Sequence, residues 1–442
     1  MILVRRVLAV LLSLLALGGA IRLVAPSAAA DPDHEPPGVR RQLAFLRSAL
    51  DDGAATDAQS LFPEGFYFLN VLYGLSWVEL GQRGVSVDEA ADEAAWALAQ
   101  VESDAGRAPF DPGATPAYGV FYAGWTNWLR GGLLTVRDDP AQRARFLADS
   151  EALAAAFDAS GTPFLEAYPG QAWPCDSTVA IASLRLAATL SGPGRFTPTV
   201  TRWVGDVRAR LDPATGLMPH TASPSVTGAR GTSQAIIQRF LVDVDPVFAR
   251  EQYLLFRTQF LDRPLGLGPA VREYPHGTDG PADVDSGPLP LGISLSTTVV
   301  ALGAAQVHGD RSLAAGYASF GEVAGLPFDT PGSKRYAGGL VPAGDAFLAW
   351  SKTARPWTTE TPGAPPQVLS GWWRAPLLAI LLLVGLAPWL RRLTAPWLPR
   401  RTAPWLPLVL RRARTRNTRE TTSVTDVPET AAMPSPTPGT RP

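Results

Sequence analysis

The chain has 442 residues, and its 39 basic and 40 acidic side chains give a formal net charge of -1. No overall positive field results, which disfavours nucleic acid as a partner. Hydrophobic residues make up 46% of the chain and charged residues 18%, a composition that predicts a folded core rather than disorder over most of the length. The single cysteine, Cys175, excludes an internal disulfide and any metal cluster with several thiolate ligands.

The chain begins with the pattern of a secretory signal. Arg5 and Arg6 precede the apolar run 7–21, and three alanines at 28–30 resemble a cleavage site. Arg22 interrupts the segment, so the alternative of an uncleaved anchor stays open. Residues 1–30 are therefore predicted to be a signal peptide or an N-terminal anchor, after which the chain is exported.

Residues 31–352 read as a succession of helices separated by Pro- and Gly-rich loops, without a long run of alternating strands. Twelve helices are expected, at 39–50, 63–81, 87–102, 117–136, 140–158, 174–190, 197–211, 233–241, 246–261, 289–307, 310–323 and 343–352.

The two members of each successive pair differ in kind. The odd-numbered helices carry a charged face and an apolar stripe, as the segment 87–102 does with Asp88, Glu89, Asp92 and Glu93. The even-numbered helices are nearly free of charge and rich in Gly, Ala, Ser and aromatic residues, which is typical of buried helices. We therefore predict an all-α exported domain, an (α/α)6 toroid of six hairpins with an inner ring and an outer ring. The alternative is an irregular α-solenoid, although no consensus repeats at a fixed period.

A second membrane signal follows the domain. A Pro- and Thr-rich linker is predicted at 353–367, a transmembrane helix at 368–390 and an Arg-rich, partly disordered tail at 391–442. Arg374 can snorkel and Trp372, Trp373 and Trp389 suit the membrane interfaces. The arginines that follow position 390 indicate a cytoplasmic tail by the positive-inside rule, with the bulk of the chain extracytoplasmic.

The alternation of helices resembles the six-hairpin toroids of many carbohydrate-active enzymes, among them inverting glycosidases, polysaccharide lyases and sugar epimerases. The resemblance covers about residues 36–352 and is architectural, without the signature of any one family. It implies an active site in a funnel at one end of the inner ring, built by the loops that enter the inner helices.

Those loops contain the unusual residues of the chain. The most distinctive string runs from Glu166 to Ser177, and the most acidic one lies at 279–285. The expected chemistry is inverting hydrolysis by two carboxylates, one a general acid and the other activating water. We expect Asp176 as one member and Asp283 or Asp285 as the other, with Glu64 and Glu273 as substitutes.

Further loop residues are expected to bind substrate. Aromatic side chains can stack on sugar rings and Arg230 can hold an anionic or hydroxyl group. The expected set is Tyr67, Tyr118, Tyr122, Trp125, Trp173, His220, Arg230, Glu273, His276 and Tyr336. Each has a structural alternative: the acids can cap helices, the aromatics can belong to the core and the histidines can be ordinary loop residues.

We expect no cofactor and no metal. Zinc held by Cys175, His220 and His276 is disfavoured because the three come from separate loops without ligand spacing, and calcium held by Asp279, Asp283 and Asp285 is a minor alternative. Cys175 is expected to fill space as a small apolar side chain. Nucleotide-binding glycine motifs, G-x-S-x-G and H-E-x-x-H are all absent from the sequence.

The sequence thus favours a membrane-anchored extracytoplasmic enzyme that acts on a glycan or glycan-like molecule. Two alternatives stay open. One is another toroid chemistry, namely a lyase, an epimerase or a dehydratase-isomerase. The other is a non-catalytic envelope protein that binds a glycan or a partner.

Overall fold

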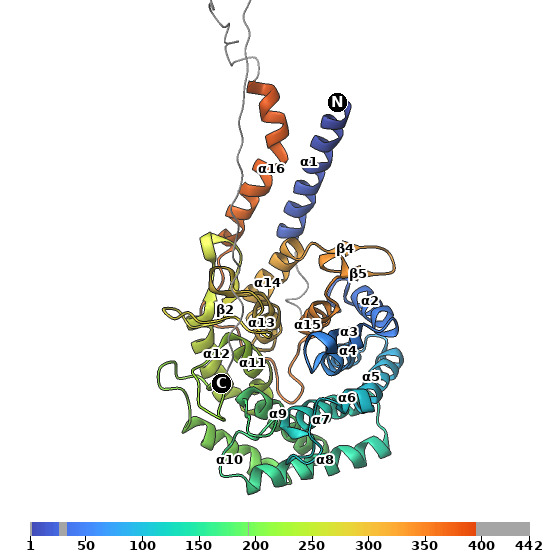
Figure 1. Cartoon of the computed structure of the whole chain (residues 1–442), viewed down its shortest axis with the longest axis vertical. Coiled ribbons are helices and arrows are strands. Elements are labelled where there is room, and N and C mark those ends of the chain that lie inside the picture. Colours follow the sequence, from blue (N-terminus) through green and yellow to red (C-terminus); the bar gives the residue numbers. More distant parts are fainter. Residues whose placement is uncertain (1, 26–32, 193, 395–442) are drawn as a thin grey trace, which may run out of the picture. The chain divides into compact units, whose positions relative to one another are not determined.

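A computed structural model describes residues 2–25, 33–192 and 194–394, and most of them lie in helices (Figure 1). The expectation of a mostly helical chain is confirmed. The alanines at 28–30 and the arginine-rich tail beyond 394 lie outside the described residues.

Six helices form a closed inner ring. Each packs against the next in chain order, and the last packs against the first. They are α4 (Gly65–Gly81), α7 (Gly119–Val136), α9 (Pro174–Ser191), α11 (Gly231–Val244), α13 (Leu295–Val307) and α15 (Pro342–Thr353). These are the helices predicted to be buried on all sides, and nearly every residue of α4 and α7 is inaccessible to solvent.

Six further helices pack outside this ring, each against one or two inner helices. They are α2 (Val39–Asp51), α5 (Val87–Val101), α8 (Pro140–Ala159), α10 (Thr197–Arg208), α12 (Pro246–Phe260) and α14 (Arg311–Ala324). Their ends follow local rules: Asp139 and Asp245 accept hydrogen bonds from the first backbone N–H groups of α8 and α12, each followed by a proline at the first helical position. Two short helices that the sequence did not predict, α3 (Ala54–Leu61) and α6 (Asp104–Arg107), precede α4 and α7.

The loops differ in length at the two ends of the ring. An inner helix passes to the next outer helix through a short connection, such as the single residue Asp245 between α11 and α12. An outer helix passes to the next inner helix through a long loop, such as the one between α12 and α13. Since inner and outer helices alternate in direction, the long loops all lie at the N-terminal end of the inner ring.

Short strands stiffen two of these long loops. In the α12–α13 loop, β2 (Ala270–Arg272) pairs antiparallel with β1 (Leu261–Asp262) and with β3 (Ile293–Ser294). In the next loop β4 (Phe328–Asp329) pairs with β5 (Lys334–Arg335). The 3-10 turns are η2 (Pro264–Gly266), η3 (Pro290–Gly292), η4 (Ala337–Gly339) and η5 (Gly371–Arg374). The helix predicted at 289–307 begins only at Leu295, because Leu291 has a positive φ and Ile293 pairs with Arg272.

The opposite end of the ring is covered by the chain that follows α15. The Trp357 ring stacks on Trp128 of α7 with 4.1 Å between ring centroids. The carboxylate of Asp243, near the end of α11, accepts hydrogen bonds from the backbone N–H groups of Trp357 and Thr358, at 2.7 and 2.8 Å. Arg355 donates to the carbonyl oxygen of Gln82, just after α4. We call residues 354–359 the closing segment; it lies in the stretch that the sequence predicts to be a linker.

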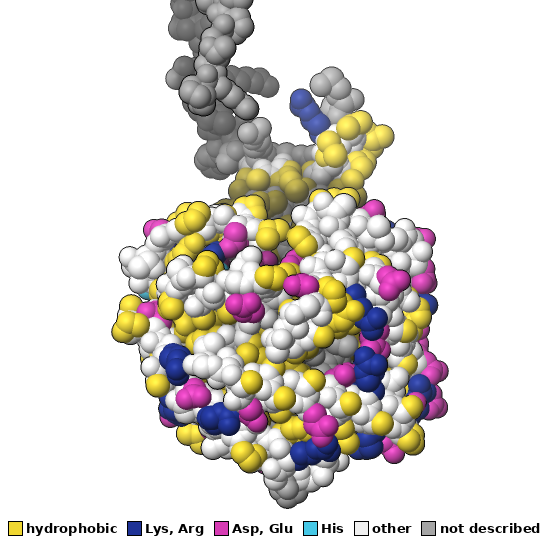
Figure 2. Space-filling model, turned by 60° about the horizontal axis from the view of Figure 1, so that its bottom comes forward, with side chains coloured by type: hydrophobic (Ala, Val, Ile, Leu, Met, Phe, Trp, Pro, Cys, Tyr) yellow, Lys and Arg dark blue, Asp and Glu magenta, His cyan; other side chains and the backbone are white. Residues whose placement is uncertain are grey.

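Two apolar helices lie outside the ring, α1 (Ile2–Val24) and α16 (Ala375–Thr394), and they are side by side in Figure 1. By length and composition, residues Leu3–Val24 and Gly371–Leu390 could each cross a membrane. In Figure 2, acidic and basic side chains are mixed over the face in view, without a large patch of one sign.

Candidate active site

Three carboxyl groups stand at the N-terminal ends of alternate inner helices. Glu64 immediately precedes α4, Asp176 lies in the first turn of α9, and Asp285 lies in the loop that leads into α13. Their charges act on one another, since both Asp285 and Glu64 raise the pKa of Asp176. The fold therefore brings together three acids that are more than 100 residues apart in the chain.

Asp176 is the buried member of this group. Burial, followed by the charges of Asp285 and Glu64, raises the pKa of Asp176 from 3.8 to about 8. Its carboxyl is within 3.8 Å of the Cys175 sulfur, whose S–H is a weak donor. A carboxyl group that keeps its proton at neutral pH can serve as a general acid.

Asp285 is the solvent-exposed member. Partial desolvation among the loops and the charges of Asp283 and Glu64 raise the pKa of Asp285 to about 6. The group is therefore ionised at neutral pH and still basic enough to accept a proton. Its backbone is held in place because the Ser296 hydroxyl, in the first turn of α13, donates to the Asp285 carbonyl oxygen.

Glu64 is bound by a tyrosine that the sequence did not single out. The Tyr168 hydroxyl donates to the Glu64 carboxylate, and the Tyr168 ring contacts Trp173 edge-on at 6.0 Å. Both aromatic side chains are half-buried. Tyr168 lies inside the distinctive string 166–177, and this position is the sequence signal that could have identified it as a candidate site residue.

The loop that carries Tyr168 is fastened to the ring at a glycine. The backbone N–H of Val120 donates to the Glu166 carbonyl oxygen at 2.9 Å. Gly119 has a φ of 78°, and a Cβ atom there would lie 2.1 Å from the Ala167 carbonyl oxygen, so no other residue permits this approach. The beginning of α7 thus positions the tyrosine beside Glu64.

Arg230 forms ion pairs with the other two candidate acids, Glu273 and Asp283. Its guanidinium pairs with Glu273 at 2.8 Å and with Asp283 at 2.6 Å. Burial opposes the ionisation of Asp283, but the Ser286 backbone N–H and Arg230 outweigh it and hold the pKa of Asp283 below its usual range. Glu273 is fully buried, and burial raises its pKa despite Arg230. The structure thus offers Asp285, rather than Asp283 or Glu273, as the partner of Asp176.

The two loop histidines have different surroundings. His220 is buried, and its Nδ1 lies 2.6 Å from the Ser233 hydroxyl, which also contacts Cys175. Burial and the neighbouring Arg230 lower the pKa of His220 to about 4, so it is neutral at pH 7. His276 instead binds the Leu261 carbonyl oxygen through Nε2, at the end of α12.

Metal and thiol chemistry each depend on how these side chains are arranged. In residues 2–25, 33–192 and 194–394, no group of three or more His, Cys, Asp and Glu side chains is arranged to hold a metal ion. Burial raises the pKa of Cys175, which keeps the sulfur protonated and counts against its use as a nucleophile.

Three predicted tyrosines pack together, and one of them, Tyr67, is close enough to Asp176 for the charge of that carboxyl to act on it. The Tyr67 hydroxyl donates to the Tyr122 carbonyl oxygen and contacts Thr126, and the Tyr122 hydroxyl accepts from Arg107. Tyr118 is half-buried and its ring lies 5.2 Å from that of Tyr122. Tyr118 is thus the tyrosine of this group that has exposed surface available for contact with a ligand.

Two predicted binding residues lie elsewhere. Trp125 is buried in the centre of the ring against Phe240 and Trp350, so its ring has no face left for a sugar. The Tyr336 hydroxyl donates to Glu322 of α14 and accepts from Lys352 of α15. It belongs to a buried cluster of charges between an inner and an outer helix. The sequence places both residues near the right loops but does not reveal the direction of their side chains.

The chain has a structural similarity to a known protein but no match in sequence. No protein-family model matches the chain, and no curated protein sequence matches it. Among solved structures, the chain is similar to a GH76 alpha-mannanase from Bacteroides thetaiotaomicron, with 10% sequence identity and a TM-score of 0.41. The similarity covers 64% of this chain and 84% of the alpha-mannanase chain.

Proposed function

We propose that this protein is a membrane-anchored toroid enzyme that hydrolyses a glycosidic bond outside the cytoplasm with inversion at the anomeric carbon. The supporting observation is the set of three carboxyl groups at the ends of α4, α9 and α13. Among the described residues, Glu64, Asp176 and Asp285 form no ion pair with an arginine or lysine. Asp283 and Glu273, by contrast, both pair with Arg230.

Asp176 is assigned the role of general acid. It carries its proton at neutral pH because burial and the charges of Asp285 and Glu64 disfavour ionisation. In the reaction it gives this proton to the glycosidic oxygen as the bond to the anomeric carbon breaks. The leaving group departs as a neutral hydroxyl.

Asp285 is assigned the role of general base. It removes a proton from a water molecule while the water oxygen bonds to the anomeric carbon from the opposite face. The proton that Asp285 gains and the proton that Asp176 loses are exchanged with solvent, so the cycle balances. This mechanism requires the two carboxyl groups to lie roughly 6.5–9.5 Å apart, with room for the water.

Glu64, Tyr168, Trp173 and Tyr118 are assigned to substrate binding. Half-buried aromatic rings present faces on which the C–H groups of a sugar can stack. The Glu64 carboxylate, bound on one side by Tyr168, has remaining acceptor positions for sugar hydroxyl groups. These groups border the acid pair and define a binding site for a neutral glycan.

The experiment is turnover of a glycan panel by the full-length protein in detergent, with Asp176→Asn and Asp285→Asn as test variants. Asp279→Asn is the matched control, because Asp279 lies in the same exposed loop as Asp285 but pairs with Arg272 and does not belong to the group of three acids. We expect both test variants to lose at least about 100-fold in kcat, the lower range for a general acid or base, and the control to keep its activity. Nuclear magnetic resonance of the first product tests for inversion.

Binding without turnover is the second candidate, favoured by the pairing of Asp283 and Glu273 with Arg230. The protein would be a glycan-binding protein and not an enzyme if saturable glycan binding survives Asp176→Asn and Asp285→Asn and no glycan yields a product. Turnover that survives both substitutions would overturn the carboxylate mechanism.

A further inference from the structure

The two apolar helices contact each other between Ser13 and Leu23 of α1 and between Arg374 and Trp389 at α16. The contacts run in opposite directions along the two sequences: Leu23 with Arg374, Gly19 with Leu381, Ala16 with Gly385 and Ser13 with Trp389. This order makes α1 and α16 an antiparallel pair. It is not the arrangement expected of a signal peptide that is removed from the finished chain.

The centre of the pair is a polar contact between otherwise apolar helices. The Ser13 hydroxyl donates to the Gly385 carbonyl oxygen at 2.8 Å and accepts from the Trp389 indole N–H at 2.9 Å. A Cβ atom on Gly385 would lie 3.1 Å from the Ala16 Cβ, so the backbones approach closely where both side chains are small. In a bilayer, helices associate through such close packing and hydrogen bonds, because lipid offers these polar groups no partner.

The ends of the pair next to the toroid are also bound to protein. Arg374 donates to the carbonyl oxygen of Leu23, and Arg22 donates to the carbonyl oxygen of Pro327, in the loop after α14. The residues on either side of Pro327, Leu326 and Phe328, are exposed hydrophobic residues. The end of α1 is thus attached both to α16 and to the toroid.

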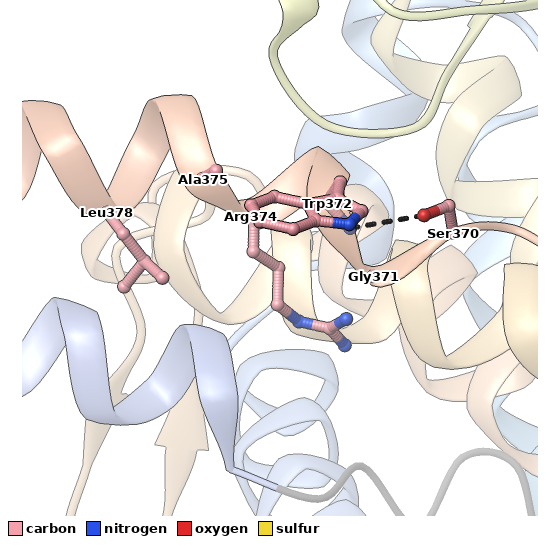
Figure 3. Close-up of a pocket in the computed structure, with 6 residues that line it drawn as sticks. All are labelled: Ser370, Gly371, Trp372, Arg374, Ala375 and Leu378. Atoms are coloured by element: carbon pink, nitrogen blue, oxygen red, sulfur yellow. Dashed lines mark hydrogen bonds between the residues drawn. The ribbon is translucent and has the colours of Figure 1, made fainter.

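The beginning of α16 has the character of a membrane interface. A pocket of about 420 Å³ is lined by Ser370, Gly371, Trp372, Arg374, Ala375 and Leu378. Figure 3 shows these side chains. Trp372 is 81% exposed, and the Arg374 side chain lies next to the apolar Ala375 and Leu378. A half-buried arginine and an exposed tryptophan beside apolar side chains suit the depth of lipid headgroups.

The far ends carry the same charge. Arg5 and Arg6 lie in the first turns of α1, and Arg391 and Arg392 follow Leu390 in the sequence. The positive-inside rule assigns each of these arginine pairs to the cytoplasm, which agrees with the antiparallel order of the two helices. The 23 residues of α1 span about 34 Å at 1.5 Å per residue, enough for a bilayer core of about 30 Å.

We propose that α1 stays in the mature protein and pairs with α16 as a transmembrane hairpin, with both chain termini in the cytoplasm. The toroid is then held by two membrane helices. The outward faces of α1, which include Leu11, Leu14 and Leu15, are exposed in the structure and face lipid in this arrangement.

The test is disulfide crosslinking of the full-length protein in its membrane, with an N-terminal epitope tag and Cys175 replaced by alanine. Ala16→Cys with Gly385→Cys should form a reducible crosslink that changes gel mobility, because their Cβ atoms lie within disulfide reach. Gly19→Cys with Leu381→Cys is the second test pair. Leu15→Cys with Gly385→Cys is the matched control, because Leu15 is 73% exposed.

We expect the tagged protein to be retained, both test pairs to crosslink on the order of tenfold more than the control pair, and the N-terminal tag to be inaccessible from outside the cell. A mature chain that begins after residue 30, an externally accessible N-terminal tag, or equal crosslinking in all pairs would each overturn the proposal. Retention of the N-terminal tag on the unsubstituted protein, and its accessibility from outside the cell, test the proposal even if the cysteine variants misfold.

Discussion

Asp176 holds a proton in a place where ionisation is costly, and this has a consequence for stability. A carboxyl whose pKa rises from 3.8 unfolded to about 8 folded binds its proton more tightly in the folded protein. The free energy of unfolding therefore falls as the pH rises from about 4 to about 8.

Asp176→Asn removes this penalty. We expect the variant to be inactive and yet more stable at pH 8, with a Tm about 2 °C or more above that of the parent, and to show a smaller gain at pH 4. Thermal unfolding of both proteins at the two pH values measures the effect. An equal change at pH 4 and pH 8, or a loss of stability at pH 8, would contradict a buried protonated carboxyl.

The acid pair also predicts a pH profile. The value of kcat/KM should rise as the pair loses its first proton near pH 6 and fall as it loses the second near pH 8. A bell-shaped curve between these limits is expected for the parent, and the Asp279→Asn control should reproduce it. A flat profile between pH 5 and pH 9 would show that this pair does not carry the proton transfers.

At the scale of elements, the closing segment contributes much of the stability of the ring. Trp357 stacks on Trp128, and its indole fills the space beside Gly132, where a Cβ would lie 2.4 Å from the Trp357 ring. Trp357→Ala should therefore lower the free energy of unfolding by about 3 kcal/mol, the lower range for large-to-small changes at an aromatic side chain. Chemical denaturation measures this loss, and the exposed Trp372→Ala serves as the control.

The sequence predicts the helices well and the loops poorly, for physical reasons. Eleven of the twelve predicted helices begin within two residues of the observed start, because buried and amphipathic helices have distinct patterns. Strands of two or three residues have no detectable period, so β1 to β5 were missed. Asp283 and Asp285 are equivalent in sequence, and only the contacts of Arg230 and Ser286, made by folding, separate them.

At the scale of the whole molecule, the two ends of the ring differ: the long loops lie at one end, and the closing segment covers the other. The burial pattern in the sequence predicts which helices form the ring. It does not predict that residues 354–359 fold back over Asp243 and Gln82, because Pro and Thr residues there read as a linker. Long-range contacts of this kind are visible only in three dimensions.

The closing segment bears on where the chain can be cut between the toroid and α16. A protease that cuts before Thr353 would remove the cover of the ring together with the anchor and leave an unstable fragment. A cut after Glu360 spares the contacts to Asp243, but the next stretch is also tied down, since the Leu369 backbone N–H donates to Ser312 of α14. A soluble version for laboratory use should therefore keep the closing segment and end after Glu360 rather than at Lys352.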